Sequence, residues 1–291
     1  MIGNECWHND VKEYYSLDDY ISDIRLFSDA MKAVDPSIKI IPNTNSRQDF
    51  TERLLTEAGD KFDMLCISNY PIGGYAGYDD WAWGEKNLMG SYRYVADLVE
   101  KHAPADKKNM QIIVSEYGAF TFAENDWGST NDMGHTMCNF DLTGKQLLEE
   151  PIPFSCYWNT RWVYDNDRAG YNALDDTNNL LATGWSLAFW TKHLFPEMIA
   201  TETSSDKIIV FSSHNPATNR IYIYVMNKDK EPVSIDLNVK NRIIEEVFRV
   251  ARMSGDAPDD FFPVINTYIC TVNKSVELPP YSINIYELKI K

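Results

Sequence analysis

Apolar and polar positions along the first 195 residues follow two patterns: the period of an amphipathic helix and the short apolar run of a buried strand. Between Leu17 and Val34 apolar side chains recur every three or four residues, which predicts an amphipathic helix. Ser16 precedes this helix as a candidate N-cap, and Asp35-Pro36 ends it because proline cannot continue the hydrogen-bond ladder. Further helices are expected at residues 47–58, 89–103, 132–149 and 181–194.

Short apolar runs separate these helices. We expect strands at residues 38–41, 62–68, 111–116 and 152–158, and a long Gly-, Tyr- and Trp-rich loop at residues 70–87. The opening residues 1–5 carry no element of their own and are typical of the end of a strand that begins upstream. Strands and helices therefore alternate, and the strands are apolar throughout. This pattern predicts a parallel sheet covered by helices.

After His193 the pattern changes to alternating or β-branched runs. Strands are expected at residues 207–211, 220–226, 233–239 and 282–288, whereas residues 242–251 fit either a helix or a strand. Turn residues such as Asn215-Pro216 separate the runs, which is typical of an all-β antiparallel sandwich. We therefore predict an α/β domain at residues 1–197 and a β-sandwich domain at residues 198–291.

Composition restricts the partners of the chain. It has 43 acidic and 27 basic residues, a net charge of −16, and no basic stripe. Binding to nucleic acid needs clustered Lys and Arg, so neither nucleic acid nor an anionic membrane surface is expected as a partner. Aromatic residues make up 13 %, with 8 Trp and 17 Tyr, which fits either a large aromatic core or a cleft that stacks on sugar rings. The oligomeric state is left open.

The five cysteines are widely spaced and show no zinc-binding spacing, so we expect no disulfide scaffold, no metal and no cofactor. Cys66 and Cys156 lie in apolar runs and are expected to be small core residues. No apolar run is long enough to span a membrane, and the first residues lack a signal-peptide pattern. Because the chain opens in the middle of an element, its compartment stays open, with a secreted or periplasmic location favoured.

Two glutamates that follow apolar strands are the strongest candidates for chemistry. Glu5 ends the opening segment, and Glu116 ends the apolar run at residues 112–115. Burying a carboxylate is costly, so this placement calls for a reason. In a (β/α)8 barrel, residues at the carboxyl ends of strands point into the catalytic mouth. Taken singly, each glutamate fits equally well as a structural or helix-capping acid.

As a pair, Asn4-Glu5 and a glutamate three strands later resemble the catalytic pair of glycoside hydrolase clan A. In that clan an Asn-Glu on the fourth strand holds the acid/base, and a Glu on the seventh strand is the nucleophile. The strands expected between Glu5 and Glu116 match this interval. Short motifs also resemble the arabinofuranosidase, xylosidase and agarase-like branches of the clan: Gly3-Asn4-Glu5, Val34-Asp35-Pro36, Phe62-Asp63 and Tyr157-Trp158-Asn159.

The resemblance covers about residues 1–195. It implies a partial (β/α)8 TIM barrel, from the end of strand 4 to helix 8, followed by the β-sandwich. It also implies a retaining O-glycoside hydrolase that acts on a plant or algal oligo- or polysaccharide through a glycosyl-enzyme intermediate, with Glu5 as acid/base and Glu116 as nucleophile. Asn4 would hydrogen-bond the 2-hydroxyl of the sugar. Further substrate-binding candidates are Trp7, Tyr70, Trp158, Trp81 and Asn43.

Two alternatives stay open. Five strands cannot close an eight-stranded barrel, so the chain alone is expected to be an inactive or poorly folded part of the enzyme. The chain also fits a non-catalytic carbohydrate-binding protein derived from such a barrel, although a pure binder need not retain both glutamates. Other reaction classes are not favoured, because the sequence has no Gly-rich phosphate loop, no GxSxG elbow and no HExxH motif.

Overall fold

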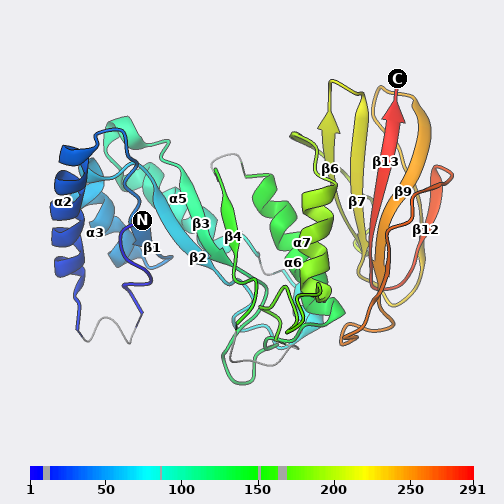
Figure 1. Cartoon of the computed structure of the whole chain (residues 1–291), viewed down its shortest axis with the longest axis horizontal. Helices are drawn as coiled ribbons and strands as arrows, with labels where there is room; N and C mark the ends of the chain where they lie inside the picture. The colour runs from blue at the N-terminus through cyan, green and yellow to red at the C-terminus, as the bar shows by residue number, and fades with distance from the viewer. Residues whose placement is uncertain (9–13, 86, 150–151, 163–168) are drawn as a thin grey trace. The chain divides into compact units, whose positions relative to one another are not determined.

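The computed structural model describes residues 1–8, 14–85, 87–149, 152–162 and 169–291 (Figure 1). These residues form two compact units. The first unit comprises Met1–Pro71, Lys86–Gly118 and Lys145–Trp158, and the second comprises Ile72–Glu85, Ala119–Gly144 and Asn159–Lys291. The domain boundary expected at residue 197 stays a prediction.

A four-stranded parallel sheet is the centre of the first unit, with the strand order β1-β2-β3-β4. Its strands are β1 (Asn43–Thr44), β2 (Leu65–Asn69), β3 (Ile112–Tyr117) and β4 (Ser155–Tyr157). The opening segment continues this order beyond β1, because Ile2 forms a parallel bridge with Pro42. Neighbours in space thus follow the order of the chain without reversal. This order is consistent with part of a barrel wall, whereas the strand order of a doubly wound sheet reverses.

The helices of the first unit lie between these strands in the sequence: α2 (Leu17–Val34), α3 (Gln48–Ala58), α5 (Gly90–His102) and the 3-10 turns Gly59–Lys61 and Ala105–Lys107. Ser16 caps α2 as expected. Its hydroxyl accepts from the Asp19 N–H at 3.2 Å, and the Asp19 carboxylate accepts from the Ser16 N–H at 3.1 Å. Such a reciprocal pair satisfies two backbone donors of the first helical turn.

Two sequence predictions in this unit are wrong. The strand expected at residues 38–41 lies instead at Asn43–Thr44, because the backbone of Ile40 is bound to Asp63. The Asp63 carboxylate accepts from the Ile40 N–H at 2.8 Å, and the Asp63 N–H donates to the Ile40 carbonyl at 2.8 Å. Cys66 is buried as expected, but Cys156 is exposed. β4 is the last strand of the four-stranded sheet, and its three residues are exposed or half-buried.

The second unit contains α4 (Tyr78–Ala82), most of α6 (Met133–Leu147), α7 (Ala182–Lys192) and an antiparallel β-module. The sequence predicted only a loop at residues 70–87, and α4 lies within it; residue 86 falls outside the described residues. Aromatic rings of the helices pack on the module. The Trp190 ring lies 4.2 Å from that of Tyr224 and stacks on Phe140 at 4.6 Å.

The β-module consists of a seven-stranded and a two-stranded antiparallel sheet. Apolar side chains of both sheets form one core, which includes Val225, Leu288 and Val276. Of the ambiguous residues 242–251, those from Ile244 onward belong to a strand, β9, which pairs with β13. The strands are β5 (Glu197–Ile199), β6 (Ile208–Asn215), β7 (Arg220–Asn227), β8 (Val233–Asp236), β9 (Ile244–Ser254), β10 (Val264–Asn266), β11 (Cys270–Thr271), β12 (Ser275–Leu278) and β13 (Ser282–Ile290).

The chain is therefore a mixed α/β protein with a parallel sheet and a separate antiparallel module. The predicted fold class is confirmed to this extent.

Candidate active site

Glu116 lies at the carboxyl end of β3 and accepts a hydrogen bond from a tyrosine that follows β2. The Tyr70 hydroxyl donates to Glu116 Oε2 at 2.7 Å, and both side chains are half-buried. Burial raises the pKa of Tyr70 above its usual value, and the hydrogen bond to Glu116 and the charges of Glu116 and Glu5 raise this pKa further. Tyr70 therefore stays protonated and can act only as a fixed donor towards the carboxylate.

Glu5 lies at the same end of the sheet, since the opening segment runs parallel to β1. Its backbone has a φ of 47°, in the left-handed region that residues other than glycine rarely adopt. Two hydrogen bonds hold this conformation. The Glu5 N–H donates to Asn43 Oδ1 at 2.6 Å, and the His8 N–H donates to the Glu5 carbonyl at 2.8 Å. An outlier that the surrounding structure holds in place is a common feature of functional sites.

Buried polar side chains fix the segment that leads to Glu5. Asn43 is fully buried, and its Nδ2 donates to the Cys66 carbonyl at 3.3 Å. The Tyr20 hydroxyl accepts from the Asn43 N–H at 2.8 Å and lies 2.8 Å from the Ile2 carbonyl, to which it can donate. A helix of the first unit is thereby joined to two neighbouring backbone segments beneath the glutamate.

Gly3 is required by the same packing. Its φ is 75°, and a Cβ atom there would lie 2.7 Å from Cys6 Sγ and 2.8 Å from Tyr20 Cε2. Any larger residue would displace Tyr20 and with it the contacts that hold the chain before Glu5.

The two carboxylates lie in different surroundings but share a neighbour. The charges of both carboxylates raise the pKa of Tyr70, that of Glu116 more than that of Glu5. Glu116 accepts the hydrogen bond of the Tyr70 hydroxyl, whereas no hydrogen bond to the Glu5 carboxylate is found among the described residues. Within these residues, a donor thus holds only one of the two carboxylates.

Aromatic side chains follow β4 next to this end of the sheet. Trp158 is half-buried, and its N–H donates to the Tyr117 carbonyl at 3.0 Å, which continues the pairing of β4 with β3. The ring of Tyr157 meets that of Tyr117 edge-on at 5.5 Å. Of the other sequence-predicted residues, Asn4 is exposed beside Glu5, and Trp7 is half-buried with its ring edge-on to Phe50 at 6.1 Å.

Trp81 belongs to the second unit. Its side chain is buried, and the indole N–H donates to Asp141 Oδ2 at 3.1 Å. Its predicted contact with substrate stays a prediction.

Sequence reasoning did not find Tyr20, and it named Tyr157 only as part of the motif Tyr157-Trp158-Asn159. Tyr20 lies beside Ile21 and four residues before Ile24 on the buried face of α2, which is a position where a polar hydroxyl needs a partner. That signal was present in the sequence. Tyr157 raises the pKa of Tyr70 through its charge, and no pattern in the sequence indicates this proximity.

Within the described ranges, no group of three or more His, Cys, Asp or Glu residues is arranged to hold a metal ion. No described helix is both long and apolar enough to cross a membrane.

Comparisons with known proteins place the fold. No protein-family model matches the sequence, and no curated protein matches it. A glycoside hydrolase family 51 α-L-arabinofuranosidase from Thermotoga petrophila superposes with a TM-score of 0.79 at 16 % identity, covering 98 % of this chain and 65 % of that one. A family 51 α-L-arabinofuranosidase from Bifidobacterium longum gives 0.70 at 11 %, covering 98 % and 66 %. A family 44 xyloglucanase from Paenibacillus polymyxa gives 0.60 at 13 %, covering 94 % and 61 %.

The chain thus spans between 61 % and 66 % of the length of these three structures. At such low identity the likeness concerns the fold. The resemblance to clan A glycoside hydrolases that the sequence motifs indicate is confirmed at this level, because both groups of structures belong to that clan.

Proposed function

We propose that this chain carries the catalytic pair of a retaining O-glycoside hydrolase, with Glu116 as nucleophile and Glu5 as acid/base. The observation that carries the proposal is the placement of two glutamates at the carboxyl end of one parallel sheet, where the Tyr70 hydroxyl holds Glu116 at 2.7 Å. The fold shared with families 51 and 44 supports a glycosidase. The retaining mechanism and the residue roles are our inference from the site.

The proposed reaction has two steps. Glu116 attacks the anomeric carbon while Glu5 protonates the departing glycosidic oxygen, which yields a glycosyl-enzyme. Glu5 then removes a proton from water, and the resulting hydroxide releases the sugar and regenerates Glu116. Tyr70 supports the first step because its hydroxyl orients Oε2 of the attacking carboxylate.

Asn43 would position the acid/base and need not touch the sugar, since its amide oxygen holds the Glu5 N–H and its nitrogen holds the Cys66 carbonyl. Asn4, which is exposed beside Glu5, remains the candidate donor to the 2-hydroxyl of the sugar. Trp158 and Trp7 remain candidates for stacking on sugar rings.

The proposed substrate is a plant or algal oligo- or polysaccharide. The similar structures are arabinofuranosidases and a xyloglucanase, so arabinofuranosides and xyloglucan are the first substrates to test.

The test is hydrolysis of aryl arabinofuranosides, xylosides and glucosides, and of xyloglucan, arabinan and agarose. It uses this chain and the longest natural form of the protein that contains it. We expect Glu116→Ala and Glu5→Gln to lower kcat/KM by about 10³-fold or more on the active substrate. Glu100→Ala, at an exposed position of α5, is the matched control and should keep full activity.

A 2-deoxy-2-fluoro glycoside of the active sugar tests the retaining step, since it should accumulate as a covalent adduct on the peptide that contains Glu116. An adduct on another residue, or full activity in Glu116→Ala, would refute the assignment. Saturable glycan binding without turnover in the longest form would instead favour the carbohydrate-binding protein.

A further inference from the structure

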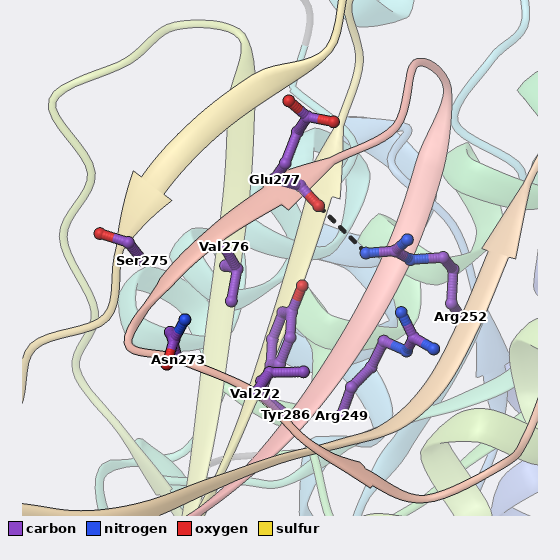
Figure 2. A pocket seen from close by; sticks show the side chains of 8 residues that line it. All are labelled: Arg249, Arg252, Val272, Asn273, Ser275, Val276, Glu277 and Tyr286. Atoms are coloured by element: carbon purple, nitrogen blue, oxygen red, sulfur yellow. Dashed lines mark hydrogen bonds between the residues drawn. The ribbon is translucent and has the colours of Figure 1, made fainter.

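The β-module has an open pocket of about 400 Å³ on one side of strands β9 and β13 (Figure 2). This volume is within the range of small-ligand sites. Its lining combines two arginines, a tyrosine and two valines with short polar side chains. The lining residues are Arg249, Arg252, Val272, Asn273, Ser275, Val276, Glu277 and Tyr286.

A β-bulge brings the two arginines to the same side of the sheet. Side chains of a regular strand alternate, so residues three apart would face opposite sides. In β9, however, Ala251 pairs with Ile285 whereas Arg249 pairs with Tyr286, which leaves one extra residue between them. Arg249 therefore stands beside Tyr286, and Arg252 stands beside its own cross-strand partner on the same face.

The two arginines differ in their partners. Arg252 is held in place: its Nε donates to Asn284 Oδ1 at 2.6 Å, and a terminal nitrogen donates to the Glu277 carbonyl at 3.1 Å, the contact drawn in Figure 2. The Arg249 guanidinium has no hydrogen-bonding or ion-pair partner among the described residues, and its Nε is buried.

Tyr286 presents a second unused donor in the same pocket. Its side chain is 1 % exposed, and its O–H finds no acceptor in the described part of the chain, because the groups beside it are the guanidinium groups of Arg252 and Arg249, which only donate. Buried polar groups are nearly always hydrogen-bonded, and each exception calls for an explanation such as a ligand that binds there. An unpaired guanidinium and a hydroxyl whose proton has no acceptor, both in one pocket, point to a ligand with several acceptor atoms.

The charge of the pocket indicates the charge of its ligand. The pocket lining contains two guanidinium groups and a single carboxylate, that of Glu277. This carboxylate is exposed, and in Figure 2 it extends away from the guanidinium groups. The pocket is thus locally cationic in a chain whose net charge is −16. A guanidinium binds a planar or tetrahedral oxyanion with two parallel hydrogen bonds. Val272 and Val276 add an apolar wall beside the charges.

We propose that this pocket binds a sugar residue that carries an oxyanionic group, either a carboxylate or a sulfate. Arg249 binds the oxyanion with its fork of donors, Tyr286 donates to the same group or to a neighbouring oxygen, and the valine wall contacts the C–H face of the sugar ring. That the oxyanion is carried by a sugar rests on the proposed glycosidase function. The oxyanion site itself rests only on the pocket.

Calorimetric titration of the whole chain tests the inference. The probes are galacturonate and galactose 6-sulfate, compared with galactose and with free acetate and sulfate. We expect both acidic sugars to bind, galactose to bind at least about tenfold more weakly, and the free anions to bind more weakly than the sugars that carry them. The two acidic sugars distinguish a carboxylate site from a sulfate site by their relative affinities.

Two variants separate binding from folding. Arg249→Gln removes the charged fork, and Tyr286→Phe removes a hydroxyl whose proton has no acceptor among the described residues. Each should weaken binding of the acidic sugars about tenfold, while Tyr286→Phe leaves the melting temperature unchanged. Arg242→Gln, at an exposed arginine of the same module, is the matched control and should bind normally.

The inference is overturned if neither acidic sugar binds, if both variants bind as the parent chain does, or if free acetate or sulfate binds as tightly as the acidic sugars. Hydrolysis is measured separately. If the chain hydrolyses glycosides but binds neither acidic sugar, only the proposal of an oxyanion-binding pocket is refuted. If acidic sugars bind in a way that depends on Arg249 but no glycoside is hydrolysed, only the proposed glycosidase function is refuted.

Discussion

At the scale of single residues, the chemistry open to Tyr70 in the candidate site is restricted by its surroundings. Tyr70 is protonated at every pH near neutrality because its pKa is raised by burial and by neighbouring carboxylates, so its hydroxyl cannot act as a base. It can only donate, and its acceptor is Glu116. A donor fixed on a carboxylate orients its oxygen atoms.

Tyr70→Phe should therefore lower kcat/KM on the active glycoside by about 10- to 100-fold, because a hydrogen bond to a charged group contributes about 1.5–3 kcal/mol. KM should change little, since the hydroxyl contacts the enzyme carboxylate and not the bound sugar. Steady-state kinetics with an aryl glycoside measures both constants.

Tyr268→Phe supplies the control, because that ring is 82 % exposed in the β-module. Equal activities of Tyr70→Phe and the parent chain would show that the hydrogen bond does not contribute to the transition state. A loss confined to KM would instead indicate direct contact of Tyr70 with the sugar.

Only part of this site could be predicted from the sequence. Glu5 and Glu116 stand out because each follows an apolar run, where a carboxylate is otherwise unfavourable. The contact between Asn43 and the Glu5 N–H joins positions 38 residues apart and depends on the close approach of two backbones, which no local pattern encodes. The left-handed backbone conformation of Glu5 could not be predicted from the sequence either. A glutamate does not prefer this conformation, and the hydrogen bond from its N–H to the distant Asn43 stabilises it.

At the scale of elements, periodicity predicted the long helices well and the short strands poorly. Helix α2 has the predicted bounds Leu17–Val34, since its amphipathic period is long and both ends carry specific signals. Strand β1 has only two residues, and its position depends on where Asp63 binds the backbone of Ile40. Helix α4 has five residues in an aromatic segment, too few for a helical period to emerge.

Helix α6 offers a test of how elements pack. Gly144 lies within it, where a Cβ atom would stand 2.6 Å from the ring of Phe211 on β6. A Gly→Ala change in a helix normally stabilises by about 0.5–1 kcal/mol, but here the added methyl group meets a rigid buried ring. We expect Gly144→Ala to lower the free energy of unfolding by about 1–3 kcal/mol in urea titrations.

Gly90 is the matched helical glycine, because it begins α5 and a Cβ there would meet no atom within 4 Å. Gly90→Ala should be neutral or slightly stabilising. If both substitutions stabilise equally, the close packing of α6 on β6 is refuted.

At the scale of the whole molecule, buried tyrosines in both units are expected to make the free energy of unfolding fall at alkaline pH. Burial, and the charge of Glu149, raise the pKa of Tyr92 in the first unit to about 12. In the second unit, burial chiefly raises the pKa values of Tyr75 and Tyr222 to about 12. An unfolded tyrosine ionises near pH 10, so above that pH the unfolded chain releases protons that the folded chain retains. Stability should thus be constant below about pH 10 and fall as pH rises towards 12.

Tyr92→Phe tests this linkage at one position, because the Tyr92 hydroxyl is buried and has no hydrogen-bond partner among the described residues. Between about pH 10 and 12 each such tyrosine lowers the free energy of unfolding by up to about 1.4 kcal/mol per pH unit. The variant lacks this contribution, so its urea midpoint should equal or exceed that of the parent chain at about pH 8 and exceed it by a larger margin at about pH 11.

Tyr268→Phe, at an exposed ring, should follow the parent at both values. Parallel declines of the parent and Tyr92→Phe would mean that Tyr92 ionises equally easily in the folded and unfolded chain, and the alkaline loss would then arise from repulsion within a chain that already carries a net charge of −16 at pH 7.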